Sequence, residues 1–299
     1  MVFSVIIKQK ERSGRMSKFH ENNNPFVDHV HLYVSNIKNS LQYYEQIIGL
    51  RLLTEQDNVI HLTADGTRPL VTLEQPENVA PRTERTAGLY HFALLLPERK
   101  DLAAFVKHLF DKEIHFGASD HKVSEAIYLR DPDGNGIEVY HDRDDSDWDW
   151  DGDEVQMSTD PLDTTNLLED LQAEWTVIPE QTIIGHIHLH VSNLEETEHF
   201  YKDVLGFQLM TRYPGAIFMA TGGYHHHIGL NIWNGEGAPP TKENSVGLYE
   251  YRIVYEENEL IDVIQKATSA NVYVKETEIG YVMEDPSKNR ILLTTKDAR

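Results

Sequence analysis

An internal repeat constrains this chain more than any other feature of its sequence. The segment HVHLYVSNIKNSLQYYEQIIGLRLL, which begins at His29, returns as HIHLHVSNLEETEHFYKDVLGFQLM from His186. Each copy opens with an alternating apolar run that predicts a strand, continues through a short Asn/Ser loop into a helix, and closes at Gly49 or Gly206. The sequence therefore predicts a duplicated fold in which a strand, a helix and a strand follow one another.

A second, looser pair of segments follows the two copies. LYHFALLLPERKDLAAFVKHLFDKEI from Leu89 matches LYEYRIVYEENELIDVIQKATSANV from Leu248. Each segment leads to a turn and a strand, DPDGNGIEVY from Asp131 and DPSKNRILLTT from Asp285, and tight turns select Asp, Pro, Gly and Asn. The chain is thus predicted to consist of four tandem modules.

The repeat divides the chain into two predicted domains. The first, residues 25–141, holds modules 1 and 2, and the second, residues 182–299, holds modules 3 and 4. Residues 142–181 open with the acidic run DRDDSDWDWDGDE and include a predicted helix from Asn166 to Trp175, which is typical of an interdomain linker. Residues 1–24 are polar and basic without a pattern, so we expect a disordered tail there.

Composition limits the chemistry that is open to the chain. Cysteine is absent from all 299 residues, so any transition metal has to be held by His, Asp or Glu. The net charge of −22 disfavours nucleic acids and anionic membranes as partners and leaves a small-molecule ligand. The apolar run Val2 to Ile7 is too short for a signal peptide and no later run could cross a bilayer, so a cytoplasmic protein is expected.

The modules carry motifs of a known superfamily. The odd modules begin with a histidine, and DPDGNGIE closes an even one. In these features the chain resembles, over nearly its whole length, the vicinal oxygen chelate superfamily, which includes glyoxalase I, the fosfomycin and bleomycin resistance proteins and the two-domain extradiol dioxygenases. The resemblance implies an α+β fold of four βαβββ modules that pair into two half-open barrels, each shaped to surround a metal.

The resemblance also implies where a metal would be bound. In the superfamily, ligands come from the first strand of one module and from the first and last strands of its partner. The matching candidates here are His29 or His186 for the first ligand, with His91 and Glu138 for the other two. Two neutral imidazoles and one carboxylate form the facial triad that leaves positions open on Fe(II), and Mn(II) accepts the same ligands.

Module 4 departs from the superfamily pattern. Tyr249 to Tyr251 stand where a histidine ligand is expected, and Arg290 to Leu292 stand where the glutamate is expected. Module 2 and module 3, in contrast, each keep an intact half-site. We interpret this as a pairing of modules 2 and 3, with the metal on His186 and the two module 2 ligands, while modules 1 and 4 form an inert barrel.

The conventional pairing of modules 1 and 2 stays open at this point. It would place the metal on His29 together with the two ligands of module 2. It would also need another group in place of a His-His pair, because Val71 to Glu74 contains no histidine. His31, His188, His190 and His225 are expected to line the site or lie on the surface.

The extradiol enzymes within the superfamily imply further roles. A histidine and a tyrosine shortly before the ligand glutamate match His121 and Tyr128, and a His-His pair in module 3 matches His226 and His227. The resemblance implies that Tyr128 contacts a substrate oxygen, that His121 orients a ligating group, and that one histidine of the pair handles protons. His227 is the better match to that member of the pair, and a neutral imidazole suits the role because it accepts and returns a proton near neutral pH.

The preferred function is therefore an extradiol dioxygenase that opens a catechol or hydroquinone-type aromatic ring with O₂. One alternative is a glyoxalase-type isomerase or thiol transferase, which would need a fourth metal ligand such as Glu74. A metal-free, small-molecule-binding resistance protein is the other alternative. The identity of the aromatic substrate and the oligomeric state, including a homo-oligomer, are left open.

Overall fold

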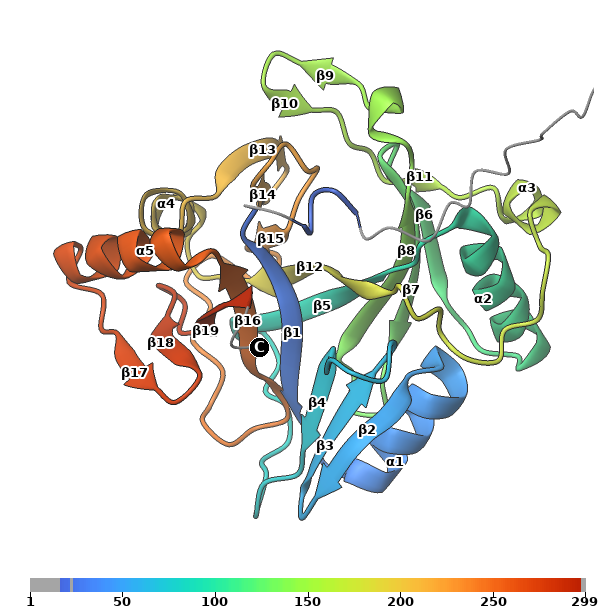
Figure 1. The fold of residues 1–299 in the computed structure, drawn as a ribbon, viewed down its shortest axis with the longest axis horizontal. Helices are drawn as coiled ribbons and strands as arrows, with labels where there is room; N and C mark the ends of the chain where they lie inside the picture. Colours follow the sequence, from blue (N-terminus) through green and yellow to red (C-terminus); the bar gives the residue numbers. More distant parts are fainter. Residues whose placement is uncertain (1–16, 22–23, 297–299) are drawn as a thin grey trace, which may run out of the picture.

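The computed structural model describes residues 17–21 and 24–296. Their strands form two large sheets, and the central strands of one lie against the central strands of the other (Figure 1). The predicted α+β fold of two half-open barrels built by duplication is confirmed. Residues 1–16 and 22–23, which make up most of the predicted disordered tail, lie outside the described residues.

The first sheet combines modules 1 and 4. Its eight strands, in spatial order, are β17 (Lys275–Thr277), β18 (Gly280–Glu284), β19 (Arg290–Thr295), β16 (Gly247–Tyr255), β1 (Phe26–Tyr33), β4 (Val71–Glu74), β3 (Val59–Thr63) and β2 (Arg51–Gln56). The two modules join where β1 pairs antiparallel with β16.

The second sheet combines modules 2 and 3. Its nine strands, in spatial order, are β11 (Asp160–Pro161), β6 (Gly117–Asp120), β7 (Ser124–Arg130), β8 (Gly136–Asp142), β5 (Gly88–Leu95), β12 (Ile183–His190), β15 (Ile228–Asn231), β14 (Ala216–Ala220) and β13 (Gln208–Tyr213). Here the modules join where β5 pairs antiparallel with β12. Modules 2 and 3 therefore pair in one sheet, as the sequence predicted. Each sequence repeat contributes one of its modules to each sheet.

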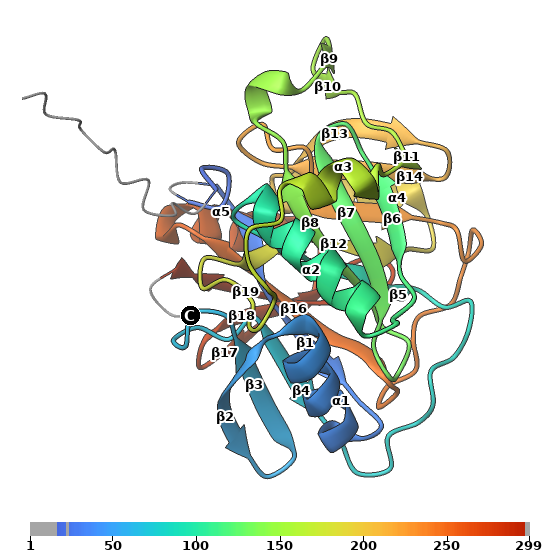
Figure 2. The ribbon, with the colours of Figure 1, turned by 90° about the vertical axis from the view of Figure 1, so that its right-hand side faces the viewer.

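Helices cover the outer faces of the sheets. They are α1 (Ile37–Tyr43) continuing into the π-helical turn η1 (Tyr44–Ile48), α2 (Arg99–Asp111), α3 (Thr164–Glu169), α4 (Leu194–His199) continuing into η3 (Phe200–Val204), and α5 (Glu257–Ser269). Figure 2 shows α2 in front of β7 and β8, with α3 beside it. In the described part of the chain no helix combines the length and the apolar character needed to cross a bilayer.

The repeated sequence has a local structural explanation. Asn36 and Asn193 occupy the same place in the two copies, and each side chain accepts a hydrogen bond from a backbone N–H in the first turn of the helix that follows. Gly49 and Gly206 end these helices at φ values of 87° and 83°, a left-handed conformation that glycine adopts without steric cost. The repeat therefore encodes both ends of its helix.

A tyrosine ties the two modules of each repeat together across the sheets. The Tyr44 hydroxyl donates to Asp131 Oδ2 at 3.1 Å, and the Tyr201 hydroxyl donates to Asp285 Oδ2 at 3.2 Å. Both aspartates sit in the turns that the sequence marks as DPDGNG and DPSKN. All four side chains are buried, and one continuous apolar core runs between the two sheets. Each repeat therefore stays a packed unit although its modules belong to different sheets.

The linker between the repeats is more structured than the sequence suggests. Its first part carries the short helix η2 (Asp145–Asp147) and a hairpin of β9 (Trp150–Asp151) and β10 (Glu154–Val155), and β11 then joins the edge of the second sheet. The predicted helix from Asn166 to Trp175 is shorter and begins earlier, as α3. It starts there because the Asp163 side chain accepts the Asn166 backbone N–H and caps the helix.

Part of the segment expected to be a tail is packed into the protein. The Phe19 ring stacks on Trp148 at 5.5 Å, and His20 is fully buried with its Nε2 2.9 Å from the Gly185 carbonyl oxygen. The contact is made by two adjacent aromatic residues, Phe19 and His20. A pair this short has no periodic pattern from which the contact could be predicted. Residues 17–21 are thus packed against the protein, whereas a disordered tail was expected there.

Candidate metal centre and cavity

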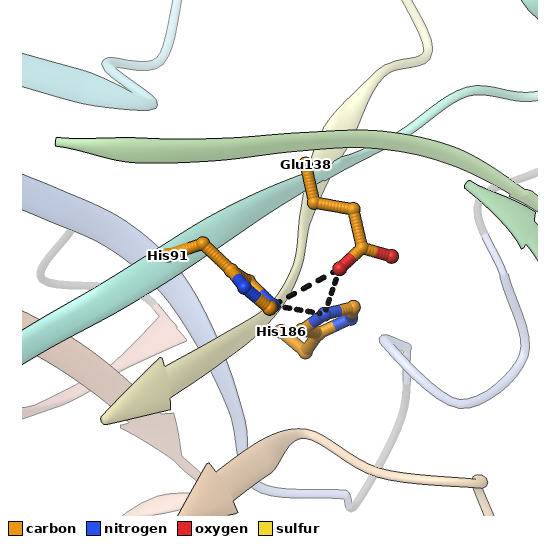
Figure 3. Close-up of side chains that lie close together, drawn as sticks. All are labelled: His91, Glu138 and His186. Atoms are coloured by element: carbon orange, nitrogen blue, oxygen red, sulfur yellow. Dashed lines mark hydrogen bonds and ion pairs between the residues drawn. The ribbon is translucent and has the colours of Figure 1, made fainter. Parts of the chain in front are cut away.

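Three strands of the second sheet bring the predicted ligands together. His91 comes from β5, Glu138 from β8 and His186 from β12, and their side chains point at one another in Figure 3. Glu138 Oε2 lies 3.0 Å from His91 Nε2 and 3.1 Å from His186 Nε2, and the two Nε2 atoms are 3.4 Å apart. Among the described residues these three form the one group whose geometry could hold a metal ion.

The spacing of these atoms fits a divalent metal. Metal–ligand bonds of about 2.1 Å at right angles would separate the ligand atoms by about 3.0 Å. The three separations, 3.0, 3.1 and 3.4 Å, lie close to that value. A set of two imidazoles and one carboxylate on one face of the ion is also the ligand set that leaves positions open for other molecules.

Electrostatics hold Glu138 and His186 in the protonation states that a metal needs. Burial works to raise the pKa of the Glu138 carboxyl, but the neighbouring His186 and His91, which hydrogen-bond to it, outweigh burial and hold that pKa well below its usual range. Burial lowers the pKa of His186 to about 4, although Glu138 opposes the shift. Glu138 is therefore an anion and His186 a neutral imidazole at neutral pH, as a metal requires.

The centre opens into an aromatic cavity of about 220 Å³. His91 and Glu138 lie in its wall, and the other lining residues include five aromatic side chains: Tyr90, Tyr128, Tyr213, Phe218 and Trp233. None of the described residues that line it is Lys or Arg. The cavity thus suits a flat, uncharged molecule.

The predicted pair His121 and Tyr128 lines the same cavity. The Tyr128 hydroxyl and His121 Nε2 are 2.6 Å apart, and His121 Nδ1 lies 2.6 Å from the carbonyl oxygen of Ser158 in the linker. Because a carbonyl oxygen only accepts, His121 Nδ1 carries the proton in this bond, and Nε2 of the neutral ring accepts from Tyr128. The linker therefore fixes the orientation of His121.

The two histidines of the predicted pair face different ways. His226 lines the cavity, and its ring centroid is 4.1 Å from that of His186. His227 instead accepts the Thr221 backbone N–H at Nδ1, and its Nε2 lies 3.2 Å from the Phe19 carbonyl oxygen. His227, which sequence reasoning assigned to proton handling, is thus held by backbone groups away from the described cavity lining. The two residues precede β15, in irregular backbone where strand alternation cannot predict which side chain faces inward.

Sequence reasoning missed several residues of the cavity. Tyr90, Phe218 and Trp233, which no sequence motif marks, are in the wall beside His188, a residue that was expected to line the site or lie on the surface. Residues 157–159 of the linker also contribute to the wall. The histidine run in HIHLHV was a usable signal for His188, since alternate residues of a strand share a face. The linker residues carry no such signal.

The alternative ligand His29 lies in the other sheet. Its Nε2 is 2.7 Å from the hydroxyl of Thr72, which His61 Nδ1 also approaches at 2.7 Å. At the positions that correspond to His91 and Glu138, this sheet has Glu250 and Leu292, and Arg290 Nε lies 2.7 Å from Glu250 Oε2. The structure brings His186, and not His29, to the group formed with His91 and Glu138.

Comparisons with known proteins agree with the fold and the motifs. The profile of the Glyoxalase/Bleomycin resistance protein/Dioxygenase superfamily matches residues 26–139 and 183–293. Catechol-2,3-dioxygenase of Bacillus subtilis (strain 168) is 45% identical over 277 residues, which cover 91% of this chain and 96% of that protein. Biphenyl-2,3-diol 1,2-dioxygenase 3 of Rhodococcus globerulus is 31% identical over 121 residues, 40% of this chain and 64% of that protein.

A solved structure shows the same architecture. The crystal structure of glyoxalase I from Zea mays superposes with a TM-score of 0.55 at 14% identity, covering 92% of this chain and 93% of that one. This likeness concerns the fold alone, whereas the profile match spans both repeats. The chain therefore belongs to the Glyoxalase/Bleomycin resistance protein/Dioxygenase superfamily, as its repeat and turn motifs predict.

Proposed function

We propose that this protein is an Fe(II)-dependent extradiol dioxygenase that opens the ring of a catechol or hydroquinone-type aromatic with O₂. The observation that carries the proposal is a His-His-Glu group at the wall of an aromatic cavity. The relative that is 45% identical over almost the whole chain is a catechol-2,3-dioxygenase, which supports the same reaction class.

His91, Glu138 and His186 would hold the metal. Bound there, Fe(II) supplies open positions on which the diol oxygens and O₂ are brought together. All three side chains are buried, so bulk water is kept from the protein side of the centre. Mn(II) suits the same ligands, and we propose Fe(II) because two histidines and one carboxylate with open positions are the ligand set typical of non-haem Fe(II) oxygenases.

The neighbouring side chains are suited to orient the ring and to move protons. The Tyr128 hydroxyl, held by His121, is near the centre and can hydrogen-bond a substrate oxygen. His226 lines the cavity beside His186, and burial lowers its pKa well below the usual range, so it is neutral and able to accept a proton. We assign to His226 the proton role that the sequence suggested for His227.

The isomerase or thiol transferase alternative asks for a fourth protein ligand. Glu74, the candidate that the sequence offered, is in the eight-stranded sheet, where its Oε2 lies 3.0 Å from His31 Nε2. A three-residue group with open positions is better matched to a metal that must accept both a diol and O₂. This geometry favours the dioxygenase.

The test is oxygen consumption. The protein is purified without air, loaded with Fe(II), and mixed with a panel of catechols and hydroquinones while O₂ uptake and ring-fission absorbance are recorded. We expect at least one compound to be consumed with one O₂ for each ring opened. Stoichiometric iron binding without O₂ uptake for any compound would overturn the proposal and leave an isomerase or transferase as the better assignment.

A further inference from the structure

A chain of hydrogen bonds leads from the cavity to a second pocket. His226 Nδ1 lies 2.7 Å from His225 Nδ1, and His225 Nε2 lies 2.8 Å from Asp142 Oδ1. His225 is fully buried between the two, and Asp142 is the last residue of β8, the strand that carries Glu138. The superfamily motifs in the sequence account for neither Asp142 nor His225.

The donors along this chain have one consistent direction. A carboxylate only accepts hydrogen bonds, so His225 Nε2 carries the proton that Asp142 receives. Nδ1 of a neutral His225 is then an acceptor, and His226 Nδ1 must donate to it. Because His226 Nδ1 is used in this hydrogen bond, Nε2 is the ring nitrogen that remains available to a molecule in the cavity. In this tautomer Nε2 carries a lone pair and no proton. Asp142 thus determines the tautomer of a residue two hydrogen bonds away.

We propose that Asp142 and His225 are positioning residues that hold His226 in the tautomer needed to accept a proton from the bound substrate; this inference rests on the proposed function. In the step, a substrate hydroxyl gives its proton to His226 Nε2. The Nδ1 proton of His226 passes to His225 Nδ1, which becomes an imidazolium paired with Asp142. His226 then presents an N–H to the cavity and can return a proton when the ring opens.

The outer end of the chain reaches solvent. Asp142 lines a second pocket of about 540 Å³, and its side chain is 16% exposed, whereas that of His225 is 0% exposed. The Tyr224 hydroxyl donates to the other carboxylate oxygen, Oδ2, at 2.9 Å and fixes the carboxylate in place. The pocket is large enough to admit a small carboxylic acid to the place that the Asp142 side chain occupies.

Because the second pocket is open to solvent, a small carboxylic acid can be tested for its ability to restore the activity of an Asp142 variant. Asp142→Ala should retain iron binding and lose about 100-fold in kcat with little change in KM, because proton transfer by a positioned group contributes at least that factor. Formate added from the second pocket should restore at least about 10-fold of the loss, as an external carboxylate in the same place. Asp145→Ala is the matched control, because Asp145 lines the same pocket and pairs with Lys18 instead. The Asp145→Ala variant should keep wild-type activity, and added formate should not change its kcat.

Histidine tautomers give a readout that needs no turnover. Long-range ¹H–¹⁵N spectra of the Zn(II)-loaded wild-type protein should show a proton on His225 Nε2 and on His226 Nδ1. Asp142→Asn, which preserves the shape of the side chain, should change this pattern. A wild-type spectrum with the proton on His226 Nε2 would overturn the proposal, whether or not the protein consumes O₂.

The outcomes separate the two proposals. A wild-type protein that shows the expected tautomers but opens no ring contradicts the dioxygenase assignment and supports the hydrogen-bond chain. A wild-type protein that consumes O₂, together with a fully active Asp142→Ala, contradicts the chain and leaves the dioxygenase assignment intact. Loss of activity in Asp142→Ala with no effect of formate and an unchanged tautomer pattern also contradicts the chain.

Discussion

His186 Nε2 lies 3.1 Å from Glu138 Oε2 even though His186 opens the second repeat and Glu138 closes a module of the first. The contact exists because β12 pairs with β5 and β5 pairs with β8, so the centre is assembled from both repeats. In the other sheet the corresponding strands carry an ion pair between Arg290 and Glu250. The Arg290 guanidinium neutralises the Glu250 carboxylate, so this carboxylate is not available as an anionic ligand for a metal ion.

The two adjacent histidines before β15 should differ sharply when mutated. His226→Gln should lower kcat by about 10²–10⁴-fold, the range that a general acid–base group contributes, because it removes the imidazole that lines the cavity. His227→Gln should keep kcat within about one order of magnitude and lower the melting temperature, since in the described structure the hydrogen bonds of the His227 ring go to backbone groups and its ring packs against His20 and Tyr224. Steady-state kinetics and thermal melts of both variants check this, and a larger kcat loss in His227→Gln would reverse the assignment.

Among small catechols, the charge of the substrate should affect kcat/KM more than its size does. No Lys or Arg is among the described residues of the cavity wall, and burying an unpaired carboxylate costs several kcal/mol. We expect neutral catechols with apolar substituents to exceed carboxylated catechols in kcat/KM by about 100-fold or more. A carboxylated ring as the best substrate in a panel matched for ring size would refute this expectation.

Much of the site could be predicted because its signals are local in the sequence. His91, Glu138 and His186 stand at fixed places in a repeated module, and the broken pattern of module 4 pointed to the pairing of modules 2 and 3. The helix ends at Asn36 and Gly49 are encoded within a few residues in the same way.

The rest depends on contacts between residues far apart in the chain. The bond from His225 to Asp142 spans 83 positions, and that from His121 to Ser158 spans 37. The choice between His226 and His227 depends on irregular backbone, where neither the 2.0-residue nor the 3.6-residue period applies. Such contacts leave no periodic trace in a single sequence.

Acid should destabilise the protein in part through His20. Burial lowers the pKa of His20 to about 4 in the folded state, against 6.5 as the ordinary value. Above pH 6.5 the residue is neutral in both states, and as the pH falls toward 4 only the unfolded chain takes up the proton. The free energy of unfolding should therefore fall by about 3 kcal/mol from this residue alone.

Urea titrations between pH 4 and pH 7.5 on wild type and His20→Gln measure this contribution. The variant should be less stable than wild type near pH 7, because it loses ring contacts with Tyr224 and His227. Its stability should also decline less steeply below pH 6.5. Parallel curves for the two proteins would show that His20 is protonated equally in both states.

The protein is expected to assemble one metal centre, from modules 2 and 3. The measurement is iron stoichiometry together with O₂ uptake for wild type, His186→Ala and His29→Ala, each loaded with Fe(II) without air. We expect one iron per chain in wild type and in His29→Ala, with turnover retained in both, and loss of iron and turnover in His186→Ala. Iron and turnover that survive in His186→Ala but vanish in His29→Ala would contradict the account.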